Sequence, residues 1–262
     1  MKFFKKRRAR LAAIIVFLLF LLFAGIGWFY YQYRFYSCPS KARYSTLGIS
    51  IPTGYSIHGI DVSRYQQTID WEAVSEMNVQ LLRLDFGFMK ATEGLQYTDP
   101  QFERNWRMIS RTRMVRGAYH YFKPQLSGRQ QAEHFIRQVR LLPGDLPPVL
   151  DVEELGGVTP QQLVEGVREW IVRLEQHYKV KPIIYSNAKF YNRYLLIHFS
   201  AYPLWVAHYY ERCVPRVFAG WSFWQHNDRG RVNGISTGVD FNVFNGSRAA
   251  FNSLRIPPTI RR

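Results

Sequence analysis

Cysteine is scarce in this sequence, and the motifs that mark many metal and nucleotide sites are missing. Only Cys38 and Cys213 occur among 262 residues, which excludes a disulfide-dense scaffold and a zinc site built from four thiolates. The histidines form neither an H-E-x-x-H nor an H-x-x-E-H arrangement, and neither glycine-rich phosphate-loop pattern is present. The sequence therefore gives no support to a zincin-type metal site or to nucleotide chemistry.

Acidic residues are also few, and this scarcity gives the chain a strong positive charge. Asp and Glu number 19 against 35 Lys and Arg, for a formal net charge of +16. Six of the basic residues lie in residues 1–10, and the remainder still has 29 basic against 19 acidic residues. Such an excess predicts an anionic partner, either nucleic acid, phospholipid or cell-wall polymer. Nucleic acid is disfavoured because the charges are scattered and form no recognisable binding motif.

A long run without charge, residues 11–31, follows the basic segment 1–10. Twenty-one residues at about 1.5 Å each span about 31 Å, roughly the hydrocarbon thickness of a bilayer. The run is longer than the apolar region of most signal peptides and ends in bulky aromatics. We expect an uncleaved signal anchor that crosses the inner (cytoplasmic) membrane once, with the rest of the chain on the periplasmic or extracellular side. A cleaved signal peptide is the alternative, and Cys38 and Cys213 either pair there or remain unrelated thiols.

Short apolar runs alternate with amphipathic segments in the main part of the chain. Residues 32–56 are interpreted as a linker, 57–246 as the folded domain and 247–262 as an exposed basic tail. Strands are expected at 57–62, 81–91, 117–122, 147–153, 182–186, 204–209, 223–226 and 239–244. Helices are expected at 69–78, 99–112, 128–141, 159–179 and 187–196. Because the alternation predicts parallel strands with crossover helices, the fold class is α/β, an irregular TIM-like barrel whose last strands are joined by loops.

The helix at 159–179 has the clearest start signal. Thr159 is placed as its N-cap, Pro160 as the first helical residue and Gln162 as the third, which matches a capping box.

Four of the few acids lie at or near ends of expected strands: Asp61, Asp151, Glu153 and Asp240. In a parallel barrel the carboxyl ends of the strands form the active face. Asp151 and Glu153 are two residues apart, so on a strand their side chains share one face and resist ionising together. A carboxylic acid that stays protonated can donate its proton to a leaving oxygen, as glycosidic bond cleavage requires. The alternative is that these acids cap helices or bind surface arginines.

Aromatic and polar residues accompany the same strand ends. Flat rings suit sugar C–H groups, although any one of them can equally belong to the core. Rings at these ends are Tyr65, Tyr97, Tyr121, Tyr185, Trp205, Tyr209 and Trp224. The candidate substrate-binding residues are Lys90, Tyr97, Tyr121, Tyr185, Trp205 and Gln225. Lys90 is expected to emerge beside an acid, and His120 is expected to be a hydrogen-bonded interior residue.

The ordered blocks GIDVSRYQ…IDW, FMKATEG, GAYHYF, LDVE, PIIYS, LWVAHY, FWQ and VDFNVF resemble glycoside hydrolase family 25 lysozymes, the Chalaropsis-type muramidases. The resemblance covers about residues 57–245. It implies an irregular β/α barrel that hydrolyses the β-1,4 bond between N-acetylmuramic acid and N-acetylglucosamine, without metal or organic cofactor. It implies that Glu153 is the proton donor, assisted by Asp151, with Asp61 on the first strand and Asp240 on the last. Attack by the substrate's own acetamido group and direct attack by water both remain open.

One departure from the family pattern is visible. The stretch from Trp71 to Lys90 is longer than in many relatives, so we expect a longer first crossover helix or loop, which leaves the site intact but alters the rim of the cleft.

Two other functions compete with the muramidase hypothesis. A non-catalytic wall-binding module would keep the barrel without turnover, but all four acid positions are filled. A chitinase-like enzyme would carry two further acids before Asp151 in D-x-x-D-x-D-x-E, and this sequence reads P-P-V-L-D-V-E there. The sequence leaves the biological role and the oligomeric state open.

Overall fold

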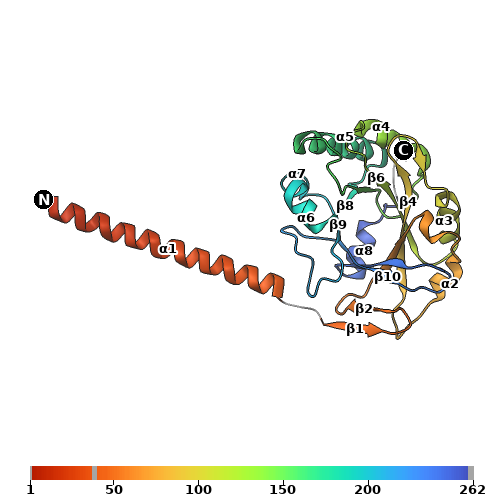
Figure 1. Cartoon of the computed structure of the whole chain (residues 1–262), viewed down its shortest axis with the longest axis horizontal. Coiled ribbons are helices and arrows are strands. Elements are labelled where there is room, and N and C mark those ends of the chain that lie inside the picture. Colours follow the sequence, from red (N-terminus) through yellow and green to blue (C-terminus); the bar gives the residue numbers. More distant parts are fainter. Residues whose placement is uncertain (1, 37–39, 259–262) are drawn as a thin grey trace. The chain divides into compact units, whose positions relative to one another are not determined.

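The computed structural model describes residues 2–36 and 40–258. These residues fall into two compact units. One comprises residues up to 39 together with 212–214, and the other comprises 40–211 with the chain after 214. The first unit holds a long helix, and the second holds a barrel with its covering helices (Figure 1).

Helix α1 spans Lys2–Tyr36 and contains the whole apolar run expected at 11–31. Its segment Arg10–Gln32 has the length and composition to cross a membrane, because 23 residues at about 1.5 Å each span about 35 Å. The large apolar side chains of residues 11–31 are exposed, such as those of Leu11 and Phe20. A signal sequence near an N-terminus has the same properties, so the helix is compatible with both the anchor and the cleaved peptide.

Eight strands of the second unit close into a barrel, as expected. They are β3 (His58–Val62), β4 (Leu84–Glu93), β6 (Val115–Tyr121), β7 (Val149–Asp151), β8 (Ile183–Asn187), β9 (Leu204–Ala207), β10 (Phe223–Gly230) and β11 (Val239–Phe244). The order around the barrel is β3-β11-β10-β9-β8-β7-β6-β4, and pairing of β3 with β4 closes it. The pairs from β3 through β4 to β10 are parallel, whereas β11 is antiparallel to both its neighbours. The short β5 (Tyr97–Thr98) pairs with the end of β4.

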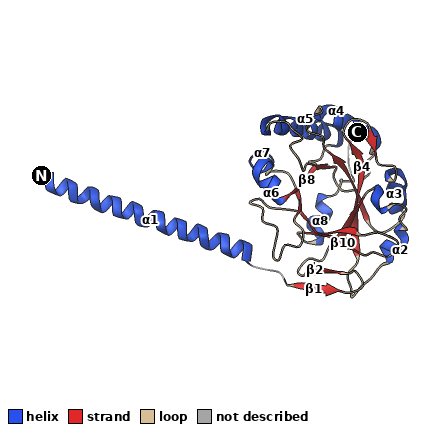
Figure 2. Cartoon of the chain, viewed as in Figure 1, coloured by secondary structure: helices blue, strands red, loops and turns tan. Residues whose placement is uncertain are grey.

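Helices lie outside the barrel strands (Figure 2). They are α2 (Trp71–Glu76), α3 (Phe102–Ile109), α4 (Gly128–Gln138), α5 (Pro160–Tyr178), α6 (Ala188–Phe190), the π-helical η2 (Tyr191–Leu195) and α7 (Leu196–Phe199). The expected capping box of α5 is confirmed: the Gln162 N–H donates to the Thr159 hydroxyl, and the Gln162 side chain accepts from the Thr159 N–H. No helix joins β9 to β10 or β10 to β11 in this fully described stretch, which also matches the expectation.

A hairpin occupies part of the range that was interpreted as linker. Strands β1 (Lys41–Tyr44) and β2 (Ile49–Pro52) pair antiparallel, and Leu47, Ile49 and Ile51 are buried. The Arg231 N–H donates to the Leu47 carbonyl at 2.9 Å, which ties the hairpin to the end of β10. The hairpin therefore covers apolar surface of β10 and β11 where no crossover helix is available, and the linker expectation is wrong for residues 41–52.

The expected basic tail is also partly structured. Helix α8 (Arg248–Leu254) begins after the N-cap Ser247, and Phe251 is fully buried. Its ring packs against Phe86 and Phe244, which lie at the amino-terminal end of the barrel. The helix thus closes the end of the barrel that lies opposite the carboxyl ends of the parallel strands.

Aromatic side chains fill the barrel interior. On β4 the residues Phe86, Phe88 and Lys90 share the inward face, because side chains alternate along a strand. The Phe88 ring stacks on Trp205 at 4.4 Å between centroids. A Cβ atom at Gly117 would lie 2.4 Å from the Phe88 ring, so only glycine fits there. These rings form an apolar floor under the polar residues at the carboxyl end.

The long first crossover is a loop rather than a longer helix. It runs between α2 and β4, where Val79 and Leu82 form an isolated bridge around Gln80 and the exposed Leu81. Because it leads into the start of β4, it lies at the amino-terminal end of the barrel. The expectation that it would alter the cleft rim is therefore wrong.

Candidate active site

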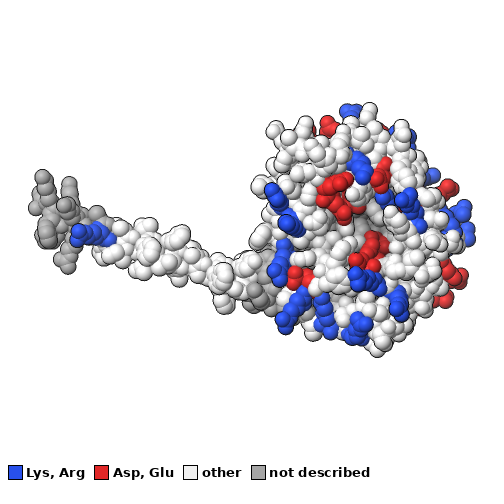
Figure 3. Space-filling model, viewed as in Figure 1, with Lys and Arg blue, Asp and Glu red and all other residues white. Residues whose placement is uncertain are grey.

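The four expected acids gather at the carboxyl end of the barrel. Asp61 lies near the end of β3, Asp151 ends β7, and Glu153 follows two residues later. Asp240 is the second residue of β11, yet it reaches the same end because β11 runs antiparallel and Asp240 pairs in register with Asp61. Figure 3 shows acidic groups on two sides of a hollow in the face of the molecule, with basic groups around it. The acids are close enough for Glu153 to influence the other three electrostatically.

Asp61 is buried as a hydrogen-bond acceptor. Its Oδ2 atom accepts from Gln225 Nε2 at 2.8 Å and from Asn242 Nδ2 at 2.7 Å. The Asn242 side chain is oriented in turn, because its Oδ1 accepts from the Trp205 indole at 2.7 Å. Burial raises the pKa of Asp61 to about 6, and the donated hydrogen bonds oppose that rise by favouring the carboxylate.

Asp240 is the protonated partner of Asp61. Burial and then the charge of Asp61 raise the pKa of Asp240 to about 9, and the two side chains share a hydrogen bond. Two carboxylates in contact cannot both ionise cheaply, so one proton stays between them at neutral pH. Since two amides already donate to Asp61, the proton belongs on Asp240 and is donated to Asp61.

Asp151 and Glu153 form the second coupled pair. Burial, followed by the charge of Glu153, raises the pKa of Asp151 well above its ordinary value. Burial likewise raises the pKa of Glu153, while a hydrogen bond with Tyr185 and the charge of Lys90 oppose the rise. Asp151 Oδ1 is buried and accepts no hydrogen bond from the described residues. The pair can therefore keep a transferable proton at neutral pH, and it presents one unsatisfied acceptor.

Three of the expected substrate-binding residues lie beneath the acids. Gln225 is 2% exposed, and its Oε1 accepts from the hydroxyls of Tyr185 and Tyr209, both at 2.7 Å. Trp205 is also 2% exposed and donates to Asn242. These positions correct the expectation of direct sugar contact for Gln225 and Trp205, since both are too buried and support Asp61 instead. Tyr185 is 6% exposed and joins Gln225 to Glu153.

The other three expected substrate-binding residues lie at the rim of the barrel's carboxyl end: Lys90, Tyr97 and Tyr121. Lys90 Nζ is 2.6 Å from Glu93, so it pairs with an acid as expected, and it lies over the rings of Tyr97 and Tyr121. Glu93 also contacts Lys123 at 3.1 Å. Of the other candidate rings, Tyr65 is 69% exposed, whereas Trp224 is fully buried in the outer layer and donates to a backbone carbonyl.

Two functional residues escaped the sequence analysis. Asn242 shares a strand face with Asp240, two residues before it, and this spacing was a usable signal. Glu93 lies in the quoted FMKATEG block, but no pattern indicated that it would neutralise two lysines.

His120 is an interior residue, as expected. Its Nδ1 is 2.7 Å from the Thr92 hydroxyl and its Nε2 is 3.1 Å from Gln131, and burial lowers its pKa to about 3. Among residues 2–36 and 40–258, no group of three or more potential ligands is placed to hold a metal ion. One G-x-S-x-G pattern begins at Gly234, but it lies in the turn before β11 and not at the strand-to-helix elbow that acyl hydrolases use.

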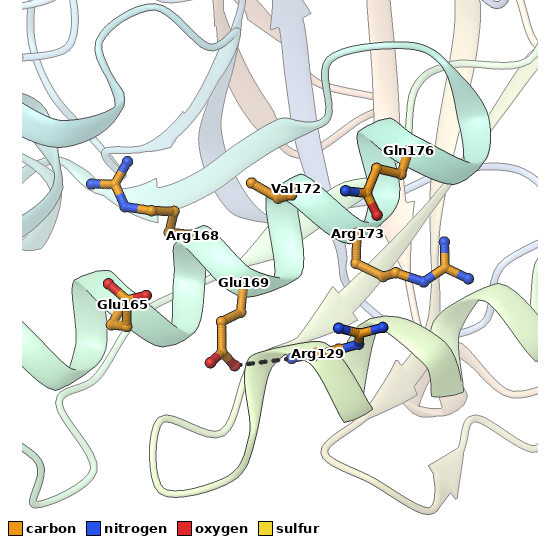
Figure 4. Close-up of a pocket in the computed structure, with 7 residues that line it drawn as sticks. All are labelled: Arg129, Glu165, Arg168, Glu169, Val172, Arg173 and Gln176. Atoms are coloured by element: carbon orange, nitrogen blue, oxygen red, sulfur yellow. Dashed lines mark hydrogen bonds between the residues drawn. The ribbon is translucent and has the colours of Figure 1, made fainter.

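A separate depression of about 300 Å³ lies between helices α4 and α5. Figure 4 shows it lined mainly by α5 side chains, with the Glu169 carboxylate accepting from the Arg129 N–H at 3.3 Å. Its lining contains none of the four acids. We regard it as the groove between two packed outer helices.

The sequence left open whether Cys38 and Cys213 pair or remain unrelated thiols. Cys213 is disulfide-bonded, and the other cysteine of the chain, Cys38, lies outside the described residues.

Comparison with known proteins identifies the family of this chain. Residues 60–235 match the family model "Glycosyl hydrolases family 25". The chain therefore belongs to glycoside hydrolase family 25 and is a glycoside hydrolase. Uncharacterized protein YegX of Escherichia coli K12 is 48% identical over 218 residues, which cover 83% of this chain and 77% of that protein.

Two relatives are enzymes by name. Lysozyme M1 of Streptomyces globisporus is 34% identical over 228 residues, which cover 80% of this chain and 74% of that protein. A family 25 glycosyl hydrolase structure from Bacillus anthracis superposes with a TM-score of 0.71 at 32% identity, covering 78% of this chain and 95% of that one. The expected family and barrel are confirmed.

Proposed function

We propose that this chain is a peptidoglycan muramidase, which hydrolyses the β-1,4 bond between N-acetylmuramic acid and N-acetylglucosamine. The observation that carries the proposal is the pair of the buried Asp151 and the partly buried Glu153 at the barrel's carboxyl end, both with raised pKa values. Membership of a family that includes lysozymes supports the substrate class.

Glu153 is the general acid. It is less buried than Asp151, so it can meet the leaving glycosidic oxygen. Its proton moves to that oxygen as the bond from C1 to oxygen breaks, and positive charge develops on the sugar ring. Asp61 faces this charge as a carboxylate fixed by two amide donors.

Asp151 assists by binding the N-acetyl group of the sugar. Its Oδ1 has no hydrogen-bond partner among the described residues, which supports a role as acceptor for the acetamido N–H. The acetamido carbonyl oxygen then attacks C1, and water opens the resulting ring to leave a reducing sugar. Direct attack by water on C1, with a carboxylate as base, gives the same reducing sugar but with the opposite configuration at C1 when it is first released.

Product analysis tests this proposal. The chain is incubated with purified peptidoglycan, and the soluble fragments are examined by mass spectrometry. A muramidase yields fragments that end in a reducing N-acetylmuramic acid. An anhydro end would instead indicate a lytic transglycosylase, and tight binding without fragments would indicate the wall-binding module.

The apolar helix supports a second part of the proposal, a location at the membrane. We propose that Arg10–Gln32 anchors the chain in the inner membrane and leaves the barrel outside the cytoplasm. N-terminal sequencing of the mature protein tests this. A start at Met1 or Lys2 in the membrane fraction agrees with an anchor, and a start beyond residue 31 contradicts it.

A further inference from the structure

Cations and tyrosines alternate along one part of the barrel rim. Each of the three cations lies 4.5–5.7 Å from the centroid of one or two of three tyrosine rings. We call this set the cation–tyrosine row, and in order it consists of Tyr65, Arg64, Tyr97, Lys90, Tyr121 and Lys123.

The row follows the edge of the barrel that carries the acids. It begins just after β3, three residues beyond Asp61. It ends beside Tyr121, which pairs in register with Asp151 on the neighbouring strand β7. A glycan bound across the acids would therefore meet the row on this side.

The charges in the row are not balanced equally. Lys90 and Lys123 both contact Glu93, and Lys123 also lies 3.6 Å from Glu154. In the described part of the chain no carboxylate lies within ion-pair distance of the Arg64 guanidinium, which is exposed and rests between the rings of Tyr65 and Tyr97. Arg64 is thus the unneutralised cation of the row.

The backbone that carries Arg64 is fixed in place. Its N–H donates to Asp99 at 2.9 Å, and the Ser63 N–H donates to Gln66 in a capping box. The Gln66 amide also donates to the Gly238 carbonyl at 3.0 Å. A cation on a fixed backbone, with its guanidinium held by two tyrosine side chains, loses less freedom on binding than a mobile arginine does.

We propose that Arg64, held by Tyr65 and Tyr97, recognises a free carboxylate of the peptide stems that substitute the glycan. The inference rests on the proposed function, because it names the part of the peptidoglycan substrate that the rim binds. The sugars are uncharged along the backbone of the polymer, whereas the stems carry carboxylates. A guanidinium has five N–H donors and binds such a group through two parallel ones, so donors remain for a carboxylate beside the hydrogen bonds of Arg64 with Tyr65 and Tyr97.

The test compares three forms of one glycan preparation: with native stems, with stem carboxylates amidated by carbodiimide and ammonia, and with stems removed by an amidase, followed by the same amidation of the lactyl carboxylates that this hydrolysis frees. Arg64→Met removes the charge but keeps the length of the side chain. We expect it to weaken binding to native sacculi, and to lower kcat/KM on them, about tenfold, which corresponds to about 1.4 kcal/mol. On the amidated and the stripped glycan the variant should differ from the wild type by less than about twofold.

Arg193→Met is the matched control. Arg193 is also exposed and also lies over the ring of the tyrosine that follows it, at 5.1 Å, but it belongs to the outer segment η2. It should behave as the wild type on all three glycans. Circular dichroism and the melting temperature verify that both variants fold.

Three results would overturn the inference. Arg64→Met could leave binding to native sacculi unchanged, it could weaken binding equally on all three forms, or Arg193→Met could give the same loss. Because binding is measured separately from turnover, a chain that binds stems through Arg64 but cleaves nothing would contradict the proposed function alone.

Discussion

Replacing Asp240 by Asn should stabilise the barrel while impairing the enzyme. Asp240 shares a hydrogen bond with Asp61 and keeps its proton because burial and that neighbour raise its pKa to about 9. The side-chain amide of the Asp240→Asn variant can donate the same hydrogen bond to Asp61 without a competing charge. The unfolded chain has an ordinary carboxyl here, with a pKa near 3.9, so above that pH the native state alone binds the extra proton.

The sign and size of the effect follow from this difference. Because the folded state binds more protons than the unfolded state between about pH 4 and pH 9, wild-type stability falls as the pH rises through that range. At pH 7, which is about 3 pH units above the pKa of the unfolded carboxyl, the lost stability has an upper bound of about 4 kcal/mol, at about 1.4 kcal/mol for each unit. Asp240 is partly exposed, so we halve this to about 2 kcal/mol. For a domain of this size that is roughly 4–8 °C in melting temperature.

Thermal unfolding of the wild type and Asp240→Asn at pH 4 and pH 8 tests the prediction. The two melting temperatures should be similar at pH 4 and should separate at pH 8, with the variant higher. Glu165→Gln is the control, because Glu165 is an exposed carboxylate on α5 and should not change the pH trend. An equal difference at both pH values, or a variant that melts lower at pH 8, would refute the shared-proton account. Turnover of the variant should fall, though less than for a change at Glu153.

Four further predictions follow from the described residues. Gly117→Ala should lower stability by about 1–3 kcal/mol in denaturant unfolding, since its Cβ would lie 2.4 Å from the Phe88 ring; an unchanged midpoint would contradict the packing. Thr159→Ala removes the N-cap of α5 and should lower the free energy of unfolding by about 1 kcal/mol in the same assay. An unchanged free energy of unfolding would contradict a stabilising role of the cap. Because burial raises the pKa of Glu153, kcat/KM should persist to a higher pH than an ordinary glutamate allows. The Lys90→Met variant should move the alkaline limb of the pH–rate profile to a still higher pH, because the charge of Lys90 lowers the pKa of Glu153. An alkaline limb that does not move would contradict the coupling of Lys90 to Glu153. Binding of the barrel to sacculi should weaken with added salt, because exposed charges are screened over about 8–10 Å at physiological ionic strength. Binding that stays unchanged with added salt would contradict a contribution of the positive charge to the affinity.

The barrel could be predicted because its strands are short, apolar and separated by clear helical segments. Elements that depend on tertiary packing were missed. The hairpin buries Leu47, Ile49 and Ile51 in the outer core, and although the missing late helices were expected, no local pattern shows that this hairpin covers the strands they leave open. Phe251 likewise belongs to the core only because the end of the barrel needs closing.

The positions of the acids and the pairing of Asp151 with Glu153 could be predicted, but the shared proton of Asp61 and Asp240 could not. Asp240 lies near the start of its strand, and only the reversed direction of β11 brings it to Asp61. Gln225 and Trp205 also lie at the correct end of their strands, yet residue type alone does not tell a sugar contact from a buried support.

Turnover of purified peptidoglycan by Glu153→Gln is the most direct test of the central claim. The substitution keeps the size of the side chain and removes the transferable proton, and general acid catalysis commonly contributes about 10²–10⁴-fold. The account predicts a loss of that size in release of reducing N-acetylmuramic acid ends, with circular dichroism unchanged from the wild type. A folded Glu153→Gln protein with near wild-type turnover would contradict the assignment of Glu153 as the acid.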